Sequence, residues 1–167
     1  MKLWLIRHAK SDWSAPAQSD FDRPLNDRGR RDAPPMTDWL VRQKDPATWI
    51  WSSDAVRARS TAAFVAEGFS AVAPQLFLDH RLYLADPDRL LDVLRETPAT
   101  VESAALVAHN PGLTELVNLL AGEAVLDNLP TFGVAGFDLQ TTWVDLRYGA
   151  GRLATLMSPK RLTSHKH

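Results

Sequence analysis

Two side chains that can do chemistry together stand near the start of the chain, where Arg7 and His8 follow an apolar run at residues 2–6. Such a run predicts a buried β-strand, and in an open α/β sheet ligands bind at the carboxyl ends of the strands. Arginine presents a planar fork of donors that matches phosphate oxygens, and histidine can be a nucleophile in a covalent mechanism. The pair indicates phosphoryl chemistry on a histidine, but a strand that simply ends in solvated polar residues fits this segment equally well.

A second candidate, Arg57, follows the strand-like run at residues 49–51. It falls in the first turn or so of a helix expected over residues 54–67, which Ser53 or Asp54 can cap. A cation is locally unfavourable at the positive end of a helix dipole, and a bound phosphate would compensate for it. A solvent-facing arginine is the alternative interpretation.

A third candidate, His109, comes directly after the small, apolar run at residues 103–108. It precedes a helix expected over residues 112–121, a place that suits a side chain facing an anion. A lone histidine in such a position is more often satisfied by backbone groups. Together with Arg7-His8 and Arg57, however, it makes three strand ends on one side of a predicted parallel sheet, and this coincidence favours a shared anion site.

The elements that must position these residues alternate between strand and helix patterns, which favours an α/β fold with a largely parallel sheet. A long loop rich in Pro, Ser and Asp is expected at residues 11–24. Asn26 can cap the helix that follows, and Pro34 and Pro35 predict a break or kink within it. The expected strands span residues 2–6, 49–51, 75–78, 103–108, 132–139 and 152–157, and the expected helices span 27–43, 54–67, 87–96 and 112–121.

Composition bounds the setting of this fold. The 167 residues suit one well-buried domain, expected over residues 1–162, with a frayed tail at 163–167. The net charge of −1 gives no field that would attract nucleic acid, and the absence of cysteine excludes disulfides and zinc–thiolate sites. No apolar run reaches transmembrane length and no signal-peptide pattern opens the chain, so a cytoplasmic protein with neither a nucleic-acid nor a membrane partner is expected.

Over most of its length the chain resembles the histidine phosphatase superfamily, also called the phosphoglycerate mutase-like fold. The opening motif, the small size and a later segment look specifically like the SixA-type phosphohistidine phosphatase branch. The resemblance implies a three-layer α/β/α domain with a largely parallel central sheet and a minimal cap. It rests on Leu5-Ile6-Arg7-His8 and its continuation to Trp13, Arg23-Pro24-Leu25-Asn26 followed by Gly29, residues 52–62 with Arg57, Arg81-Leu82-Tyr83-Leu84-Ala85, and the segment with His109.

The resemblance implies that His8 is the nucleophile and becomes a phosphohistidine that water then hydrolyses. Arg7, Arg57 and a cationic His109 would bind the phosphoryl oxygens where charge spreads in the transition state. These positive charges would also lower the pKa of His8 and keep it neutral. The other ring nitrogen of His8 needs an acceptor, expected to be a backbone carbonyl. No cofactor and no metal is expected, because the protein's own cations supply the charge.

The sequence departs from the family at the general acid. Many phosphoester-cleaving members carry a Glu after the third strand, whereas residues 78–86 contain none. Asp79, His80 and Asp86 are candidate substitutes at the acid or the rim, and Ser11 is a candidate for the rim, although loop and capping roles suit the first three better. A positioned acid helps an alkoxide to leave by about 10²–10⁴-fold. The imidazole of phosphohistidine leaves more easily, so the missing acid favours that substrate.

Three functions are therefore open at this point. The first is a phosphatase for phosphohistidine on a protein partner, the second a phosphatase for a small phosphorylated substrate, and the third a module that binds phosphate or a phosphoprotein without turnover. The short segment between residues 70 and 103 predicts an open site, with Trp13, Phe21 and Tyr83 at its rim or over the core. An intact His8 argues against the pure binder, which needs no nucleophile. The oligomeric state is left open.

Overall fold

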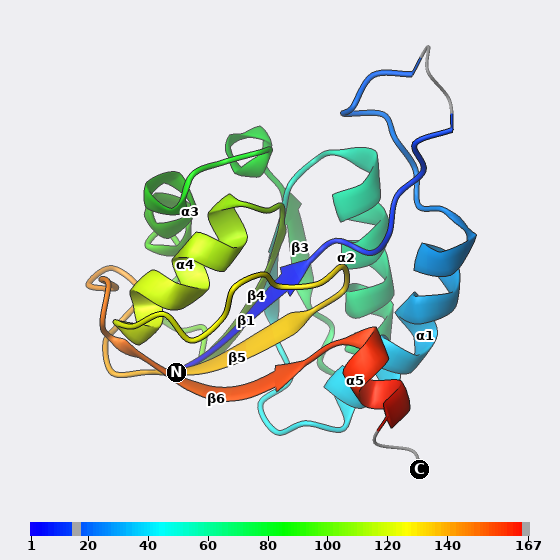
Figure 1. Cartoon of the computed structure of the whole chain (residues 1–167). Coiled ribbons are helices and arrows are strands. Elements are labelled where there is room, and N and C mark those ends of the chain that lie inside the picture. The colour runs from blue at the N-terminus through cyan, green and yellow to red at the C-terminus, as the bar shows by residue number, and fades with distance from the viewer. Residues whose placement is uncertain (15–17, 165–167) are drawn as a thin grey trace.

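A mixed sheet forms the centre of the computed structural model, which describes residues 1–14 and 18–164 (Figure 1). Its strands within these residues are β1 (Lys2–Arg7), β2 (Trp49–Ser52), β3 (Gln75–Leu78), β4 (Ser103–Ala108), β5 (Val134–Leu139) and β6 (Gly151–Met157). They lie in the order β3-β2-β4-β1-β5-β6. Strands β1 to β4 pair in parallel, and β5 runs antiparallel to both of its neighbours.

Helices cover both faces of this sheet (Figure 1). Alternate side chains of β1 point to opposite faces, as the period of a strand requires. Trp4 and Ile6 pack in one core, and Leu3 and Leu5 pack in the other. The first core is covered by α1 (Asp27–Val41), α2 (Val56–Gly68) and α5 (Pro159–Ser164), and the second by α3 (Pro87–Leu94) and α4 (Gly112–Ala121). The expected α/β fold with three layers and a largely parallel sheet is confirmed.

The central strand β4 explains why its sequence is both apolar and small. All six of its residues are buried, because β1 and β2 flank it and helices cover both faces. Small side chains there let the helices of both layers approach the sheet. Burial of each larger neighbour such as Leu5 or Ile6 stabilises the fold by about 1.5–3 kcal/mol.

The N-terminus of α1 behaves as expected, but its middle does not. The side chain of Asn26 accepts a hydrogen bond from the backbone N–H of Gly29 at 2.8 Å, which confirms it as the cap. The helix then continues through Pro34 and Pro35 without the expected break. The prolines remove two N–H donors, but they lie at positions that leave the corresponding carbonyls on the exposed side of the helix, where water can bond them.

The structure also corrects the expectations for the start of α2 and for the end of the chain. Helix α2 begins at Val56 without a side-chain cap bond, so neither Ser53 nor Asp54 caps it in the expected way. Thr163 and Ser164, expected in a frayed tail, instead end α5, while residues 165–167 lie outside the described part of the chain. The α5 turn is kept in place because Leu162 packs against the core under α1 and α2.

The described helices include none that is both long and apolar enough to cross a membrane. The expected loop at residues 11–24 contains neither helix nor strand in its described parts, with residues 15–17 outside them. An isolated bridge joins Ser11 to Leu25 and closes the base of this loop. Two short 3₁₀ turns, at Ser70–Val72 and His80–Leu82, complete the structure.

Candidate active site

Three neighbouring strands, β2, β4 and β1, end at the same edge of the sheet and bring the predicted site residues together. Arg7 is the last residue of β1 and His8 follows it, Arg57 lies in the first turn of α2 after β2, and His109 follows β4. All four line one cavity of about 260 Å³. The other residues around this cavity are Lys10, Ser11, Trp13, Asp20, Arg23, Leu84, Asn110 and Thr131.

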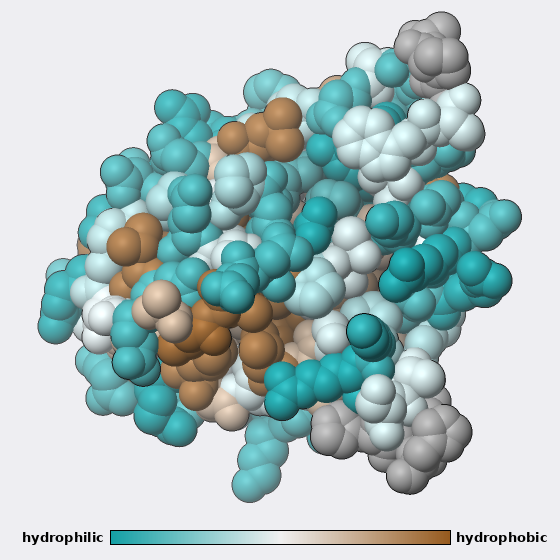
Figure 2. Space-filling view, in the orientation of Figure 1, coloured by the Kyte–Doolittle hydropathy of each residue, from teal (hydrophilic) through white to brown (hydrophobic). Residues whose placement is uncertain are grey.

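The surface over this end of the sheet is mostly polar. Figure 2 shows teal and white atoms beyond the arrowhead of β1, whereas the brown, hydrophobic surface of this face gathers over α4, β5 and β6. A polar mouth above a cavity lined by arginines suits a charged ligand.

The imidazole of His8 is held in one tautomer by the chain itself. Its Nδ1 lies 2.7 Å from the carbonyl oxygen of Ala9, so Nδ1–H donates there and Nε2 keeps its lone pair. The expected backbone acceptor is thus the carbonyl of Ala9. Burial, together with the charges of Arg57 and Arg7, lowers the pKa of His8 to about 3. The expectation named only the charges, whereas desolvation is the largest cause.

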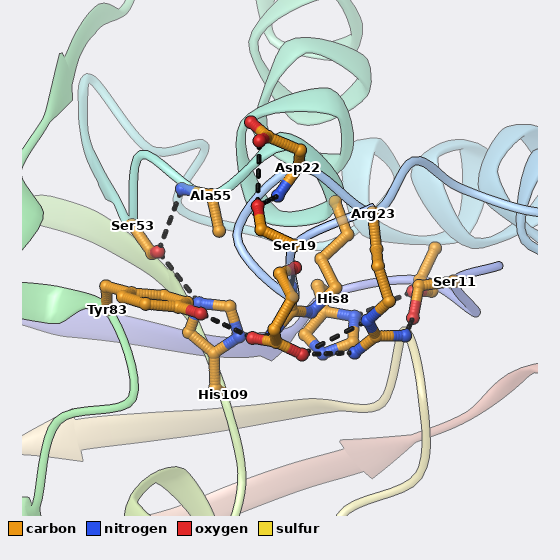
Figure 3. A network of polar contacts seen from close by, with 12 residues as sticks. His8, Ser11, Ser19, Asp22, Arg23, Ser53, Ala55, Tyr83 and His109 are labelled. Carbon is orange, nitrogen blue, oxygen red and sulfur yellow. Dashed lines mark hydrogen bonds and ion pairs between the residues drawn. The ribbon is translucent and has the colours of Figure 1, made fainter. Parts of the chain in front are cut away.

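His109 is fixed by a hydroxyl group that sequence reasoning assigned only to capping. Its Nε2 lies 2.7 Å from Oγ of Ser53, which itself accepts a hydrogen bond from the backbone N–H of Ala55 (Figure 3). The Ser53 hydroxyl can therefore donate to Nε2, which leaves the proton of a neutral His109 on Nδ1. A sequence signal existed, because Ser53 stands at the end of β2 directly beside β4.

The charge of His109 differs from the expectation. Burial, together with the neighbouring His8 and Arg57, lowers the pKa of His109 to about 2. The side chain is therefore neutral near pH 7, and the prediction of a cationic His109 is wrong for this structure. A neutral ring still offers one N–H donor, so it can bind an oxyanion without adding a charge beside His8.

Three buried donor nitrogens that belong to residues lining this cavity have no hydrogen-bond partner among the described residues. They are Nε of Arg7, Nε of Arg57 and Nδ1 of His109. A buried donor left unsatisfied costs about 1–3 kcal/mol, so such groups normally have a partner in the ligand-bound state. Each belongs to one of the residues grouped around His8, and together they can hold the oxygens of a tetrahedral oxyanion.

Asp20 is a member of the site that sequence reasoning missed. One carboxylate oxygen accepts hydrogen bonds from Nε and Nη2 of Arg23 at 3.1 and 3.0 Å. The other accepts from Nη2 of Arg57 at 3.0 Å and from the hydroxyl of Tyr83. Desolvation opposes ionisation, but the hydrogen bonds from Tyr83, Arg23 and Arg57 outweigh it and lower the pKa of Asp20 to about 2. The carboxylate is therefore ionised at neutral pH.

Arg23 holds the loop that carries Asp20. Its guanidinium is buried, donates from Nη1 to Oγ of Ser11 at 2.6 Å, and stacks over the ring of Trp13 with 3.4 Å to the centroid. Figure 3 shows Arg23 between His8 and Ser11. Ser11, a candidate for the rim, thus lies in the cavity wall and positions Arg23. The Trp13 ring is 74% exposed, so it forms part of the mouth.

Gly29 allows α1 to approach this loop closely. A Cβ atom at Gly29 would lie 2.2 Å from the carbonyl oxygen of Lys10, which is too close for any other residue without a backbone shift. The same carbonyl accepts a hydrogen bond from the N–H of Asn26. The turn before α1 therefore holds Lys10, at the start of the loop and close to His8, in place.

The three candidate acids lie elsewhere. Asp79 accepts from the backbone N–H of Arg81 and pairs with its side chain, and Asp86 caps α3. His80 is exposed and contacts Asp54. None of the three is among the described residues that line the cavity, so their assignment as acid or rim is corrected to capping and surface contacts.

Of the aromatic side chains expected at the rim or over the core, Trp13 lines the cavity, whereas Phe21 and Tyr83 pack at the margin of the core. Tyr83 packs edge-on against Phe21, with 5.1 Å between centroids, and against His109, with 5.5 Å. Phe21 belongs to the margin of the core. Among the described residues, no cluster of three or more His, Asp or Glu could hold a metal ion.

The fold and the sequence both match known phosphatases. Residues 3–82 match the model of the histidine phosphatase superfamily (branch 1). A proposed phosphohistidine phosphatase SixA from Agrobacterium tumefaciens superposes with a TM-score of 0.82 at 28% identity, over 95% of this chain and 97% of that one. The protein histidine phosphatase SixA in complex with tungstate gives 0.79 at 25% identity, over 97% and 99%. The uncharacterised protein Rv1276c of Mycobacterium tuberculosis is 29% identical, over 93% of this chain and all of its own length.

The chain belongs to the histidine phosphatase superfamily and is a phosphatase with the phosphoglycerate mutase-like fold. Within the superfamily it belongs to the SixA-like branch.

Proposed function

We propose that this phosphatase removes the phosphoryl group from phosphohistidine on a protein partner, through a covalent intermediate on His8. The observation that carries the proposal is the set of three unpartnered donors on Arg7, Arg57 and His109 around a neutral His8. Donors in place before the substrate arrives stabilise developing charge without reorganisation.

In the first step Nε2 of His8 attacks phosphorus and forms a P–N bond. The bond from phosphorus to the substrate nitrogen breaks, and its electron pair stays on that nitrogen. Arg7, Arg57 and His109 hold the three equatorial oxygens, where charge is greatest in the transition state. The proton on Nδ1 of His8 stays hydrogen-bonded to Ala9 throughout.

In the second step water attacks the phosphorus of phospho-His8. The P–N bond breaks, its electrons return to Nε2, and the surplus proton of water passes to solvent or to the released phosphate. His8 is then neutral again and ready for the next cycle. The same three donors serve both steps, because the charge appears on the same oxygens each time.

Among the described residues that line the cavity there is no protonated carboxyl group to act as a general acid, and this supports a nitrogen leaving group. Among the described lining residues the carboxylate is that of Asp20, which is ionised and cannot protonate an alkoxide. An imidazole that already carries a proton on its other nitrogen leaves as a neutral molecule and needs no acid at the breaking bond. The SixA proteins that the chain resembles carry the name of phosphohistidine phosphatases, which supports the same class of substrate.

The mouth of the cavity supports a protein as the carrier. Trp13 and Leu84, 74% and 55% exposed, flank it and leave the site open to a side chain presented on a larger surface. Apolar side chains beside a polar pocket are typical of residues that anchor a partner.

Phosphate release from a phosphohistidine-bearing protein, compared with p-nitrophenyl phosphate and a panel of alkyl phosphates, tests the proposal. The expected result is rapid dephosphorylation of the protein, slow cleavage of the aryl ester and little cleavage of alkyl esters. Fast turnover of one alkyl ester would instead make the protein a phosphatase of a small metabolite. Tight binding of phosphoprotein without phosphate release would make it a binding module.

A further inference from the structure

The loop carboxylate of Asp20 lines the cavity and is bonded to Arg57 and Tyr83. The donors at the base of the cavity are deeply buried, with Arg57 and His109 each 2% exposed and His8 6%. In an in-line displacement the leaving group lies opposite the nucleophile, and so on the side away from His8. That side is the open one, and the side chain of Asp20 is 40% exposed there.

We propose that Asp20 determines the specificity of the enzyme by accepting a hydrogen bond from the ring N–H of the phosphohistidine leaving group. This inference rests on the proposed function and adds the residue that selects an imidazole over an oxygen leaving group. Held by Arg23 and Tyr83, the carboxylate favours a ring that is protonated on its distal nitrogen.

The hydrogen bonds of Asp20 show how the site can make this contact. In the structure its two oxygens accept four hydrogen bonds, two from Arg23, one from Arg57 and one from Tyr83, which is the full capacity of a carboxylate. Arg57 also donates from Nη1 to the backbone carbonyl of Asp20 at 2.7 Å. Under the proposal, Nη2 of Arg57 exchanges its bond to the carboxylate for one to a phosphoryl oxygen, while Nη1 can keep its bond to the carbonyl. One lone pair of Asp20 is then released beside the leaving group, while Arg23 and Tyr83 keep the carboxylate in place.

The electron balance of the step explains why an ionised carboxylate, which accepts a hydrogen bond, suits this position better than a proton-donating acid. Phosphorus is bonded to one ring nitrogen of the substrate and a proton sits on the other. As His8 attacks, the P–N bond breaks, its electron pair stays on the ring and the proton remains where it was. The ring departs as neutral imidazole. Asp20 therefore gives up no proton and takes none, but stabilises the protonated ring that leaves most readily.

The same charge acts against oxygen leaving groups. An alkoxide or phenolate that develops negative charge beside an ionised carboxylate is repelled by it. No N–H is available on such a leaving group to occupy the lone pair that Arg57 released. Asp20 thus both attracts one class of substrate and rejects the other, as selective sites commonly do.

The test is the variant Asp20→Asn, which keeps the size and shape of the side chain and removes its charge. The ratio of kcat/KM for phosphoimidazole or phosphohistidine to kcat/KM for p-nitrophenyl phosphate should fall by about ten- to a hundredfold, the value of a hydrogen bond to a charged group. At high pH the value of kcat/KM for phosphohistidine should fall as the ring loses its proton. In Asp20→Asn this fall should begin at a lower pH than in the wild type. The reason is that Asp20 no longer raises the pKa of the bound ring.

Asp22→Asn is the matched control, since Asp22 lies in the same loop, bonds Ser19 and is not among the described residues that line the cavity (Figure 3). It should leave the ratio as in the wild type. Equal changes for both substrates in Asp20→Asn would overturn the proposal and make Asp20 only a support for Arg57. If the Asn variant failed to fold, Tyr83→Phe, which removes one bond to Asp20, should lower the same ratio by a smaller factor, and an unchanged ratio would again overturn it.

These outcomes differ from a failure of the proposed function. If the wild-type protein cleaves p-nitrophenyl phosphate but neither phosphohistidine nor phosphoimidazole, the proposed substrate is wrong before any variant is made. If it cleaves phosphohistidine well and Asp20→Asn keeps the wild-type ratio, the function stands and the role of Asp20 alone is refuted.

Discussion

The cavity has two walls that differ in how the chain builds them. The strand-end wall consists of Arg7, His8, Arg57 and His109, which follow the carboxyl ends of β1, β2 and β4 and lie deep in the cavity. The loop wall consists of Trp13, Asp20 and Arg23, which lie between β1 and α1 and are held by hydrogen bonds and a stacked ring.

Under the proposed function the two walls contact different parts of a substrate. Unpartnered donors belong to the strand-end wall and suit the phosphoryl oxygens, which every phosphorylated substrate shares. The ionised carboxylate and the exposed aromatic ring belong to the loop wall, on the open side of the cavity, and are proposed to contact the group that carries the phosphoryl group. Bond cleavage and substrate choice are therefore separable, and changes in the two walls should have different signatures.

The largest effect is expected from removal of the nucleophile. His8→Ala should lower turnover of every substrate by at least about 10³-fold, because the remaining residues can bind phosphate but cannot form the covalent intermediate. The fold should survive, since the hydrogen bond of the His8 ring goes only to the adjacent Ala9. Phosphate release and a thermal melt measure both points. His80→Ala, at an exposed histidine outside the cavity, should keep full activity.

A smaller but equally general loss is expected for Arg57→Ala. Removal of this donor should lower kcat/KM by about 10²–10³-fold or more on both phosphohistidine and aryl phosphate, because Arg57 serves the phosphoryl oxygens. Arg59→Ala, which changes an exposed arginine on the same helix, should have little effect. A loss confined to one substrate would contradict the separation of the two walls.

The buried histidines of the strand-end wall should make stability depend on pH. Burial lowers the pKa of His8 to about 3 and of His109 to about 2, from 6.5. As pH falls from 6.5 towards 3, the unfolded chain binds protons that the folded chain does not. The free energy of unfolding should therefore fall with pH, by up to about 1.4 kcal/mol per pH unit for each histidine.

Urea unfolding at several pH values between 4 and 7 checks this slope. The variant His109→Gln should show a shallower dependence than the wild type, because one buried titrating group is gone. A wild-type stability that is flat over this range would mean that the two rings are solvated, and that the neutral nucleophile needs another explanation.

The smallest effect is expected for the group that orients His109. Ser53→Ala removes the hydroxyl bonded to Nε2 and should lower kcat by up to about tenfold, the value of a neutral hydrogen bond. The loss should be the same for both substrates, since Ser53 supports the strand-end wall. A change in the ratio between substrates would show that the two walls are coupled through His109.

The strand-end wall was predictable because its positions follow from local patterns and sheet topology. An apolar run that ends in Arg7-His8 marks the end of a strand, and parallel neighbours place Arg57 and His109 at the same edge. The charge of His109 was not predictable, because it depends on burial among side chains that only the folded structure brings together.

The loop wall was beyond sequence reasoning for a physical reason. The position of Asp20 depends on Arg57, Arg23 and Tyr83, which lie 37, 3 and 63 residues away along the chain. An irregular loop has no period that predicts which side chain points inward, and the Asp-rich segment offered several equal candidates. The predicted break at Pro34 and Pro35 was wrong for a similar reason. Packing of α1 on the core overrides the local preference of the two prolines.

The most direct test of the central claim is to look for the covalent intermediate on His8. Rapid quenching of the reaction with a protein carrying radiolabelled phosphohistidine should trap up to one label per chain, stable to alkali, lost in acid and mapped by peptide mass spectrometry to His8. The variant His8→Ala should acquire none. Phosphate release at the wild-type rate without any label on His8 would contradict the mechanism and point to direct attack by water.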